Sequence, residues 1–290
     1  MALKKVARQM PVFEIDMGGI PVKQALPTQR VEQIDPFLLL HHGKFDPMQD
    51  RPARQQGVGP HPHRGFSPVT FVIQGEVHHQ DSRGNSQVAK AGDVQWMHAG
   101  MGIIHSERPT EASIEAGELQ EIIQLWINSP GAKKMLPPDY QHVPREEMPV
   151  FASEDGLLAS RLIAGEYAGK QGPIRTQSDL LVHWGEGKAG GTIQYTIPEG
   201  FNTTLYLVKG RLRVEGTGLV EPETLLLFDQ AGDTISLEAK SDAQFLLLSG
   251  RPLEEKVVQQ GPFVMNSETQ IMEAMRDYQM GKMGFLVEEY

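Results

Sequence analysis

The sequence contains no cysteine. Without thiols the chain can form no disulfide bond, and no thiolate is available as a nucleophile or as a metal ligand. Any transition-metal site in this protein must therefore be built from His, Asp and Glu.

Positive charge and long apolar segments are also scarce. Lys and Arg total 27 against 37 Asp and Glu, which gives a formal net charge of -10. A surface this acidic repels a phosphate backbone, so direct binding to nucleic acid is not expected. The first ten residues are basic but lack the apolar core of a signal peptide, and no apolar run has the length of a membrane span. We expect no membrane association and a cytoplasmic protein, with a nuclear location open for a eukaryotic source.

Turn-forming residues, in contrast, are abundant, with 30 Gly and 20 Pro. They separate short segments rich in β-branched and aromatic residues, such as VTFVIQG, TLYLVKG and QFLLLSG. This pattern predicts an all-β protein built from a sandwich or barrel. One helix is expected near the end, in NSETQIMEAMRDYQMG, where Ser267 and Gln270 have capping-box spacing and Gly281 follows as a C-cap.

An internal repeat divides the chain. GFSPVTFVIQG, from Gly65, aligns without a gap with GFNTTLYLVKG, from Gly200, and AGDVQWM later matches AGDTISL. A length of 290 residues also favours two domains. We therefore predict two β-domains in tandem, residues 1–131 and 132–290, with the loop-like stretch NSPGAKKMLPPDYQ at the boundary.

Two pairs of polar residues have the spacing of strand neighbours. His61 and His63 lie one residue apart in HPHRGF, and His105 and Glu107 repeat this spacing in HSE. Side chains at i and i+2 of a strand point to the same side of the sheet. Two adjacent strands that each offer such a pair to a barrel interior can surround one metal ion with three imidazoles and one carboxylate.

The ligand types narrow the choice of metal. Nitrogen and oxygen ligands without sulfur suit Fe(II), Mn, Ni, Cu or Zn. Four protein ligands leave open positions on a six-coordinate ion, where O₂ and a chelating substrate can bind, and this favours non-haem iron. The alternative is a pair of structural histidines, because H-x-H alone is a weak signal. The aligned positions in the second repeat are Thr196, Pro198, Phe245 and Leu247, so no metal is expected in the second domain.

Residues around these pairs have simpler interpretations. His78 and His79 are adjacent and cannot share a strand face, which favours surface positions. Phe66 is interpreted as a core residue because Phe201 recurs in the second copy. For Arg64, a hydrogen bond near the site and a position in solvent are both left open.

Longer motifs around the candidate ligands resemble the pirin family of the cupin superfamily: HPHRGF, AGDVQWMHAGMGIIHSE, QLWIN, GPFVMNSETQI and DYQMGKMGF. The resemblance is collinear from about Asp35 to Phe285. It implies two antiparallel β-barrel (cupin) domains in tandem with a short C-terminal helix, and one mononuclear iron in the N-terminal domain. The residues that match the family's metal ligands are His61, His63, His105 and Glu107.

Two positions depart from the family pattern. Ser67 stands where an acidic residue commonly follows HPHRGF, and His41 stands where an acidic residue often follows DPFLLL. The first change should spare the metal ligands, because the family's glutamate ligand lies on the later strand. The second, with His42 beside it, is expected to alter the mouth of the pocket.

The resemblance also implies an activity. Members of the family are credited with quercetin 2,3-dioxygenase activity, so the expected partners are O₂ and a small aromatic substrate such as a flavonol. In this hypothesis Glu107 is both a ligand and the catalytic general base that takes the hydroxyl proton of the substrate. The alternative is an iron-containing, redox-sensing interaction protein, a pirin-like co-regulator whose partners are other proteins.

Overall fold

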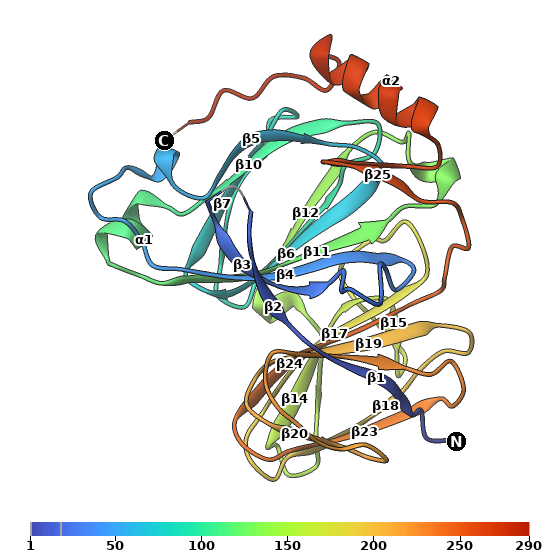
Figure 1. Cartoon of the computed structure of the whole chain (residues 1–290). Helices are drawn as coiled ribbons and strands as arrows, with labels where there is room; N and C mark the ends of the chain where they lie inside the picture. The colour runs from blue at the N-terminus through green and yellow to red at the C-terminus, as the bar shows by residue number, and fades with distance from the viewer. Residues whose placement is uncertain (1, 18, 290) are drawn as a thin grey trace. The chain divides into compact units, whose positions relative to one another are not determined.

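The computed structural model describes residues 2–17 and 19–289, and almost all regular structure in them is β-strand (Figure 1). Two compact units are present. The first barrel consists of residues 17, 19–22, 37–145 and 254–289, and the second barrel consists of residues 2–16, 23–36 and 146–253. The predicted all-β fold of two cupin barrels with a C-terminal helix is confirmed. The predicted domain boundary between residues 131 and 132 stays a prediction. Each compact unit combines several separate segments of the chain, so a single boundary does not describe the two units.

Two antiparallel sheets form the first barrel. In the larger sheet β12, β9, β6, β11 and β4 follow in this order, with β3 beside β4, and the smaller sheet has the order β5-β10-β7-β8. The bounds are β3 (Pro21–Leu26), β4 (Phe37–Phe45), β5 (Val58–His63), β6 (Phe66–Gln74), β7 (Glu76–Asp81), β8 (Ser86–Lys90), β9 (Val94–His98), β10 (Ile103–Arg108), β11 (Gln120–Asn128) and β12 (Asp139–Val143). Short helices α1 (Glu111–Glu115), η1 (Ala53–Gln55), η2 (Gly131–Lys133) and η3 (Arg145–Glu147) occupy connections.

The second barrel repeats this plan. Its larger sheet has the order β1-β22-β19-β24-β17-β14-β13, and its smaller sheet has the order β18-β23-β20-β21. The bounds are β1 (Val6–Pro11), β2 (Phe13–Asp16), β13 (Val150–Ala152), β14 (Leu158–Ala164), β15 (Glu166–Tyr167), β16 (Lys170–Gln171), β17 (Leu180–Gly187), β18 (Thr192–Thr196), β19 (Asn202–Lys209), β20 (Leu212–Val214), β21 (Gly218–Val220), β22 (Thr224–Phe228), β23 (Thr234–Ala239) and β24 (Ala243–Gly250).

The strand order confirms one half of the predicted repeat and corrects the other. β6 and β19, which begin the two aligned GF segments, hold equivalent places in their sheets. The turn AGDVQWM, however, leads into β9, whereas AGDTISL leads into β23, whose place corresponds to β10. The counterpart of His105 is therefore Thr234, which pairs with Thr196 as His105 pairs with His61, and not Phe245.

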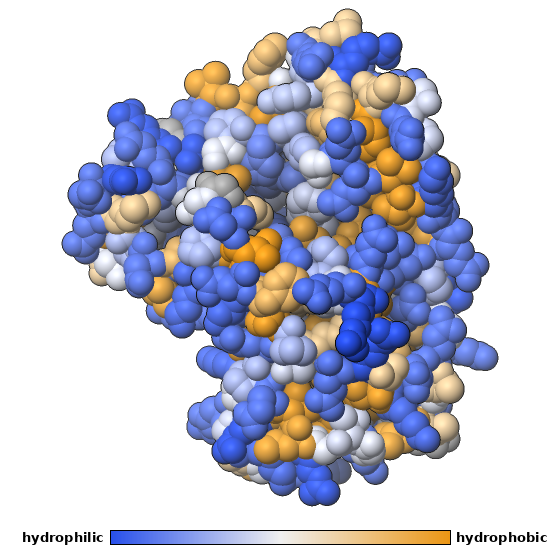
Figure 2. Space-filling view, viewed as in Figure 1, coloured by the Kyte–Doolittle hydropathy of each residue, from blue (hydrophilic) through white to orange (hydrophobic). Residues whose placement is uncertain are grey.

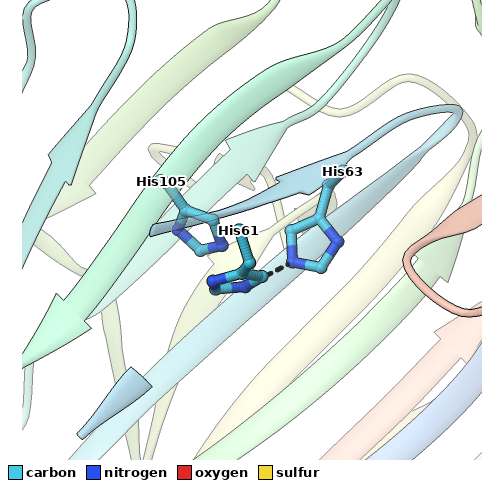
Figure 3. A group of neighbouring side chains, drawn as sticks. All are labelled: His61, His63 and His105. Atoms are coloured by element: carbon cyan, nitrogen blue, oxygen red, sulfur yellow. Dashed lines mark hydrogen bonds between the residues drawn. The ribbon is translucent and has the colours of Figure 1, made fainter. Parts of the chain in front are cut away.

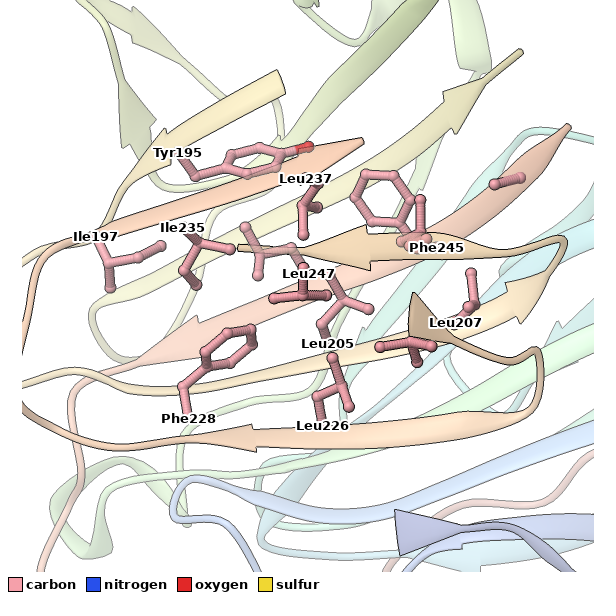
Figure 4. Close-up of a cluster of buried hydrophobic side chains, with 14 of the residues drawn as sticks. Tyr195, Ile197, Leu205, Leu207, Leu226, Phe228, Ile235, Leu237, Phe245 and Leu247 are labelled. Carbon is pink, nitrogen blue, oxygen red and sulfur yellow. The ribbon is translucent and has the colours of Figure 1, made fainter. Parts of the chain in front are cut away.

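Apolar side chains fill the second barrel (Figure 4). The positions wrongly aligned with the ligand pair, Phe245 and Leu247, are both fully buried in this cluster, and Phe201 is also part of it. Each large aliphatic or aromatic side chain removed from water contributes about 1.5–3 kcal/mol. The cluster also includes Leu158, Leu162, Leu181, Tyr195, Ile197, Leu205, Leu207, Leu226, Phe228, Ile235 and Leu237.

Residues 254–289, here called the C-terminal segment, belong to the first barrel. The segment contains β25 (Val258–Gln260), β26 (Phe263–Met265) and the predicted helix α2 (Glu268–Gln279). Ser267 caps the helix by accepting from the Gln270 backbone N–H at 3.3 Å, and Gly281 follows the helix with φ 70°. The Gln270 side chain accepts from the N–H of Asn266, one residue before the position of a capping box.

The helix α2 packs against the first barrel through one face. Ile271 and Ala274 are buried in a cluster that includes Ile104 of β10, the residue before His105. On the face shown in Figure 2, hydrophilic residues cover most of the surface, with smaller hydrophobic areas between them. Within residues 2–17 and 19–289, neither α-helix has the length and apolar character needed to cross a bilayer.

Candidate metal centre

Three of the four predicted ligands converge from two paired strands. β5 and β10 run antiparallel, with His61 opposite His105 and His63 opposite Ile103. Figure 3 shows the three imidazole rings facing one another between these strands. One nitrogen of each ring lies within 4.8 Å of the other two. The i, i+2 spacing and the strand pairing therefore produce the three-histidine cluster expected from the sequence.

Hydrogen bonds to the far side of two rings fix which nitrogen faces the cluster. Nδ1 of His61 lies 2.8 Å from the Gly59 carbonyl oxygen, and Nδ1 of His63 lies 3.3 Å from that of Pro262. A carbonyl oxygen can only accept, so each Nδ1 carries the hydrogen and each neutral ring presents the Nε2 lone pair. These two Nε2 atoms are 3.0 Å apart. Lone pairs at this distance repel unless a proton or a metal cation lies between them.

Burial disfavours the proton. It lowers the pKa of His63 and of His105 well below the ordinary value, and the neighbouring His61 lowers both pKa values further. Burial also lowers the pKa of His61. Neutral imidazole is the form that binds metals. The three imidazoles are therefore in the form that can bind a metal cation.

The third ring has a nitrogen that no group in the described part of the chain satisfies. Nε2 of His105 is buried without a hydrogen-bond partner in the described part of the chain. A buried polar atom left without a partner costs about 1–3 kcal/mol. A metal ion within the cluster would satisfy this atom, so the residues present fit the group that the sequence predicts.

Glu107 lies beside this group but not within it. β5 contains a bulge between His61 and Val58, so Glu107 pairs with Val58. The carboxylate accepts from Thr70 Oγ1 at 2.5 Å and from Gln124 Nε2 at 2.7 Å, one bond for each oxygen. These donors hold the carboxylate of Glu107 at the wall of the cavity described next.

A cavity of about 610 Å³ opens beside the cluster, entirely within the first barrel. This volume falls in the usual range for small-molecule sites. His61, His63 and Glu107 line it, together with alternate residues of β4 and β11. The large apolar residues of the lining include Leu39, Phe45, Met48, Ile122 and Trp126. An apolar chamber with a polar, metal-competent end suits an aromatic ligand with few hydrogen-bonding groups.

His41 projects into the same cavity. It is two residues from Leu39 and from Gly43 on β4, so the three residues share the strand face that lines the cavity. It lies opposite Gln124 in the strand pairing. Burial lowers the pKa of His41 to about 4, so the ring is neutral near pH 7. The residue singled out as a departure from the family pattern thus contributes to the cavity wall.

Two other sequence interpretations are resolved by the contacts. Arg64 is buried and donates to the Met101 carbonyl oxygen at 2.6 Å and twice to Asp277 Oδ2 at 3.1 Å, so it does not face solvent. Phe66 is fully buried, as predicted, and its ring packs edge-on against His63 with centroids 5.0 Å apart.

The surface position expected for His79 is wrong. Its side chain is buried, with Nδ1 3.3 Å from Nδ1 of His105 and Nε2 3.1 Å from Asp81 Oδ2. A sequence signal for this was present, because His79 and Asp81 have the same i, i+2 spacing as the two selected pairs. The adjacent His78, whose side chain is on the opposite face of the strand, masks this signal in the sequence.

The family model described as Pirin matches residues 19–127, and the model described as Pirin C-terminal cupin domain matches residues 185–284. A protein of Pseudomonas aeruginosa named "Putative quercetin 2,3-dioxygenase" is 40% identical over 266 residues, which are 91% of this chain and 92% of that protein. Pirin of Rattus norvegicus is 34% identical over 289 residues, which are 97% of this chain and 94% of that protein.

A solved structure resembles the chain over nearly its whole length. The crystal structure of a quercetin 2,3-dioxygenase from Acinetobacter baumannii has a TM-score of 0.90 and 38% sequence identity. The match covers 99% of this chain and 100% of that chain.

Proposed function

The chain belongs to the pirin family, and we propose that it is a metal-dependent dioxygenase acting on a flavonol-like substrate such as quercetin. One observation carries this proposal: three histidines converge, and two of them, His61 and His63, line an apolar cavity together with the carboxylate of Glu107. The names of the Pseudomonas and Acinetobacter proteins support an oxidoreductase of this type.

The proposed metal is a single Fe(II) in the first barrel, with Mn, Ni, Cu or Zn permitted by the same ligand types. His61, His63 and His105 would hold it through Nε2, and Glu107 is proposed as the fourth ligand. A bound ferrous ion would supply Lewis-acid and redox chemistry for the reaction of the substrate with O₂.

Glu107 is also the proposed general base. Its carboxylate lines the cavity, so a substrate hydroxyl bound there can pass its proton to a carboxylate oxygen. Thr70 and Gln124 orient this carboxylate through their hydrogen bonds. The two C–C bonds at the hydroxyl-bearing carbon break, that carbon leaves as carbon monoxide, and both atoms of O₂ enter the remaining organic product. The proton returns to the carboxylate of that product, so the reaction needs no external reductant.

The remaining cavity residues position the substrate and exclude water. Trp126 packs edge-on against His63, with ring centroids 5.4 Å apart, and so presents an aromatic wall next to the cluster. Neutral His41 contributes a polar side chain to the wall of the same cavity. An apolar chamber without bulk water also protects a reactive substrate anion from protonation.

The test is a direct assay of the purified protein. Metal content is quantified, and loss of quercetin is followed together with uptake of O₂. We expect turnover that falls at least about 100-fold in His61→Ala, because one metal ligand is lost. His78→Ala is the matched control, since His78 bonds Ser86 and stands outside the cluster.

The opposing results are specific. Iron bound without turnover of any flavonol would overturn the dioxygenase proposal and favour the redox-sensing interaction protein. Full activity in protein stripped of metal would overturn the metal-dependent mechanism.

A further inference from the structure

We propose that His79, held by Asp81, is a positioning residue that fixes the ring orientation and the tautomer of the metal ligand His105. The inference deepens the proposed function, because it rests on the same metal centre. It adds a third strand, β7, to the two that carry the ligands.

The strand register places the four side chains on one face. In the pairing of β10 with β7, His105 lies opposite Asp81 and Glu107 lies opposite His79. Directly opposite residues in an antiparallel pair point to the same side of the sheet. His79 therefore reaches His105 diagonally, and its ring centroid is 5.2 Å from that of His105.

The hydrogen bonds are compatible with a single arrangement of protons for a metal-bound His105. A ligating Nε2 presents its lone pair, so Nδ1 of His105 carries the hydrogen. That hydrogen points to Nδ1 of His79, 3.3 Å away, which must act as the acceptor. Nε2 of His79 then carries its own hydrogen and donates to Asp81 Oδ2 at 3.1 Å. The carboxylate of Asp81, at one end of this series of hydrogen bonds, thus determines which nitrogen of His105 is left to bind a metal.

Asp81 is itself anchored. Its Oδ1 accepts from the backbone N–H groups of Arg83 at 2.8 Å and Asn85 at 3.1 Å, and Oδ2 accepts from Asn85 Nδ2 at 2.7 Å. The β7–β8 turn therefore fixes the carboxylate before any metal binds. Tyr140 stacks on the His79 ring, with centroids 4.1 Å apart and planes 13° apart, which limits rotation of the ring.

A buried histidine beside an aspartate can also be purely structural, and the first barrel offers a comparison. His142 bonds Asp93 Oδ2 at 3.0 Å, and Asp93 in turn holds the N–H groups of Lys90 and Arg145 at a turn. His79 differs because its second nitrogen faces a histidine whose Nε2 belongs to the metal-binding group. Hydrogen-bond partners of this kind tune metal affinity in many metal sites.

The experiment compares three variants of the full chain. His79→Phe keeps a ring to stack on Tyr140 but removes the acceptor for His105. His79→Gln keeps an acceptor and a donor. His78→Phe changes the neighbouring histidine, which bonds Ser86, and serves as the matched control. Circular dichroism and the melting temperature first establish that each variant is folded.

The first readout is affinity for Fe(II) and for Zn(II), measured by competition with a chelator. We expect a loss of about 10–100-fold in His79→Phe, the range found for outer partners of metal ligands. His79→Gln should recover most of this loss, and His78→Phe should match the wild type. Equal affinity of folded His79→Phe and wild type would overturn the inference.

The second readout is the tautomer of His105, seen by ¹⁵N NMR of histidine-labelled protein with and without Zn(II). We expect hydrogen on Nδ1 in the wild type and a mixture of tautomers in metal-free His79→Phe. The same single tautomer in both proteins would contradict the inference. If the wild type bound no metal yet showed this tautomer difference, the proposed function would fail while the positioning role stood.

Discussion

At the scale of single residues, the buried histidines of the two barrels are used in different ways. His183 of the second barrel lies among the rings of Phe151, Tyr167 and Tyr195, and its Nδ1 is 3.0 Å from Ser160 Oγ. Burial lowers its pKa to about 3 from the ordinary 6.5. This ring faces no ligand cluster, so its titration is expressed only in stability.

A pH dependence of stability follows from this pKa. Between pH 6.5 and about 3 the unfolded chain binds a proton at His183 that the folded chain does not. The free energy of unfolding of the second barrel should therefore fall as the pH drops through this window, with His183 contributing a slope of up to about 1.4 kcal/mol per pH unit. Urea unfolding at several pH values, with hydrogen exchange read on peptides of the second barrel, measures it.

The contributions of other titrating groups to the pH dependence cancel when the free energy of unfolding of His183→Phe is compared with that of the wild type. The variant should have a shallower slope between pH 6.5 and 4, and the two curves should run parallel above pH 7.5. Parallel curves over the whole range would show that His183 is not the source. His142→Phe, in the first barrel, is the control and should leave the slope of the second barrel unchanged.

Residue patterns predicted the candidate ligands better than the residues that support them. The grouping of His61, His63 and His105 could be predicted because strand alternation is a local rule that two short motifs satisfy. The donors that hold Glu107 could not be predicted. Thr70 and Gln124 belong to β6 and β11, and these strands come together only when the sheet has formed. The place of His79 beside the cluster could have been predicted from its spacing to Asp81.

At the scale of elements, motif similarity and structural equivalence diverge. The AGD turns occur before β9 in one barrel and before β23 in the other, and these strands have different places in their sheets. A tight turn requires the same residues wherever it occurs, so its sequence does not identify the strand that follows. The GF segments are more reliable because a whole strand with its buried alternation repeats with them.

The element α2 offers a clean test of its packing. Ile271 is buried in the cluster with Ile104, while Met272, the next residue, is 62% exposed. Ile271→Ala should destabilise the first barrel by about 2–5 kcal/mol, because it leaves a cavity. Met272→Ala should change the free energy of unfolding by less than about 0.5 kcal/mol. Urea unfolding monitored by hydrogen exchange of β10 and α2 peptides gives both values.

The two variants also separate packing from mere helix propensity. Both replacements introduce alanine into the same turn of the same helix, so any effect of propensity is similar in the two. If both variants were equally stable, α2 would not be anchored on β10.

At the scale of the whole molecule, chain order and spatial order differ. The C-terminal segment is separated in sequence from the ligand strands by the second barrel, yet it supplies their supports. Pro262 accepts from His63, and Arg64 donates to Asp277 in α2. Farther along, the guanidinium of Arg108, at the end of β10, donates twice to the Glu288 carboxylate, at 2.9 and 3.1 Å.

Removal of this segment should therefore weaken metal binding. A chain ending at Leu253 loses Pro262, Asp277 and Glu288 as partners and exposes Ile104. We expect metal content to fall at least about tenfold, because the support of one ligand is lost. Metal analysis and chelator competition measure the change.

A separate peptide of residues 254–289, added to the shortened chain, provides the control. It should restore part of the affinity, and a peptide carrying Asp277→Ala should restore less. Undiminished metal binding by the shortened chain would show that the first barrel needs no support from this segment.

The place of Pro262 and Glu288 in the sequence gives the candidate metal centre a property that a site made from one continuous stretch lacks. A ribosome adds roughly 5–20 residues per second, so β5 and β10 leave it well before these residues are made. His63 then lacks its hydrogen bond to Pro262, and Arg108 lacks its bonds to Glu288, while the second barrel is synthesised. We expect tight metal loading to follow translation of the C-terminal segment. A prematurely terminated chain would remain metal-poor, and a filled site would report that this part of the protein had been completed.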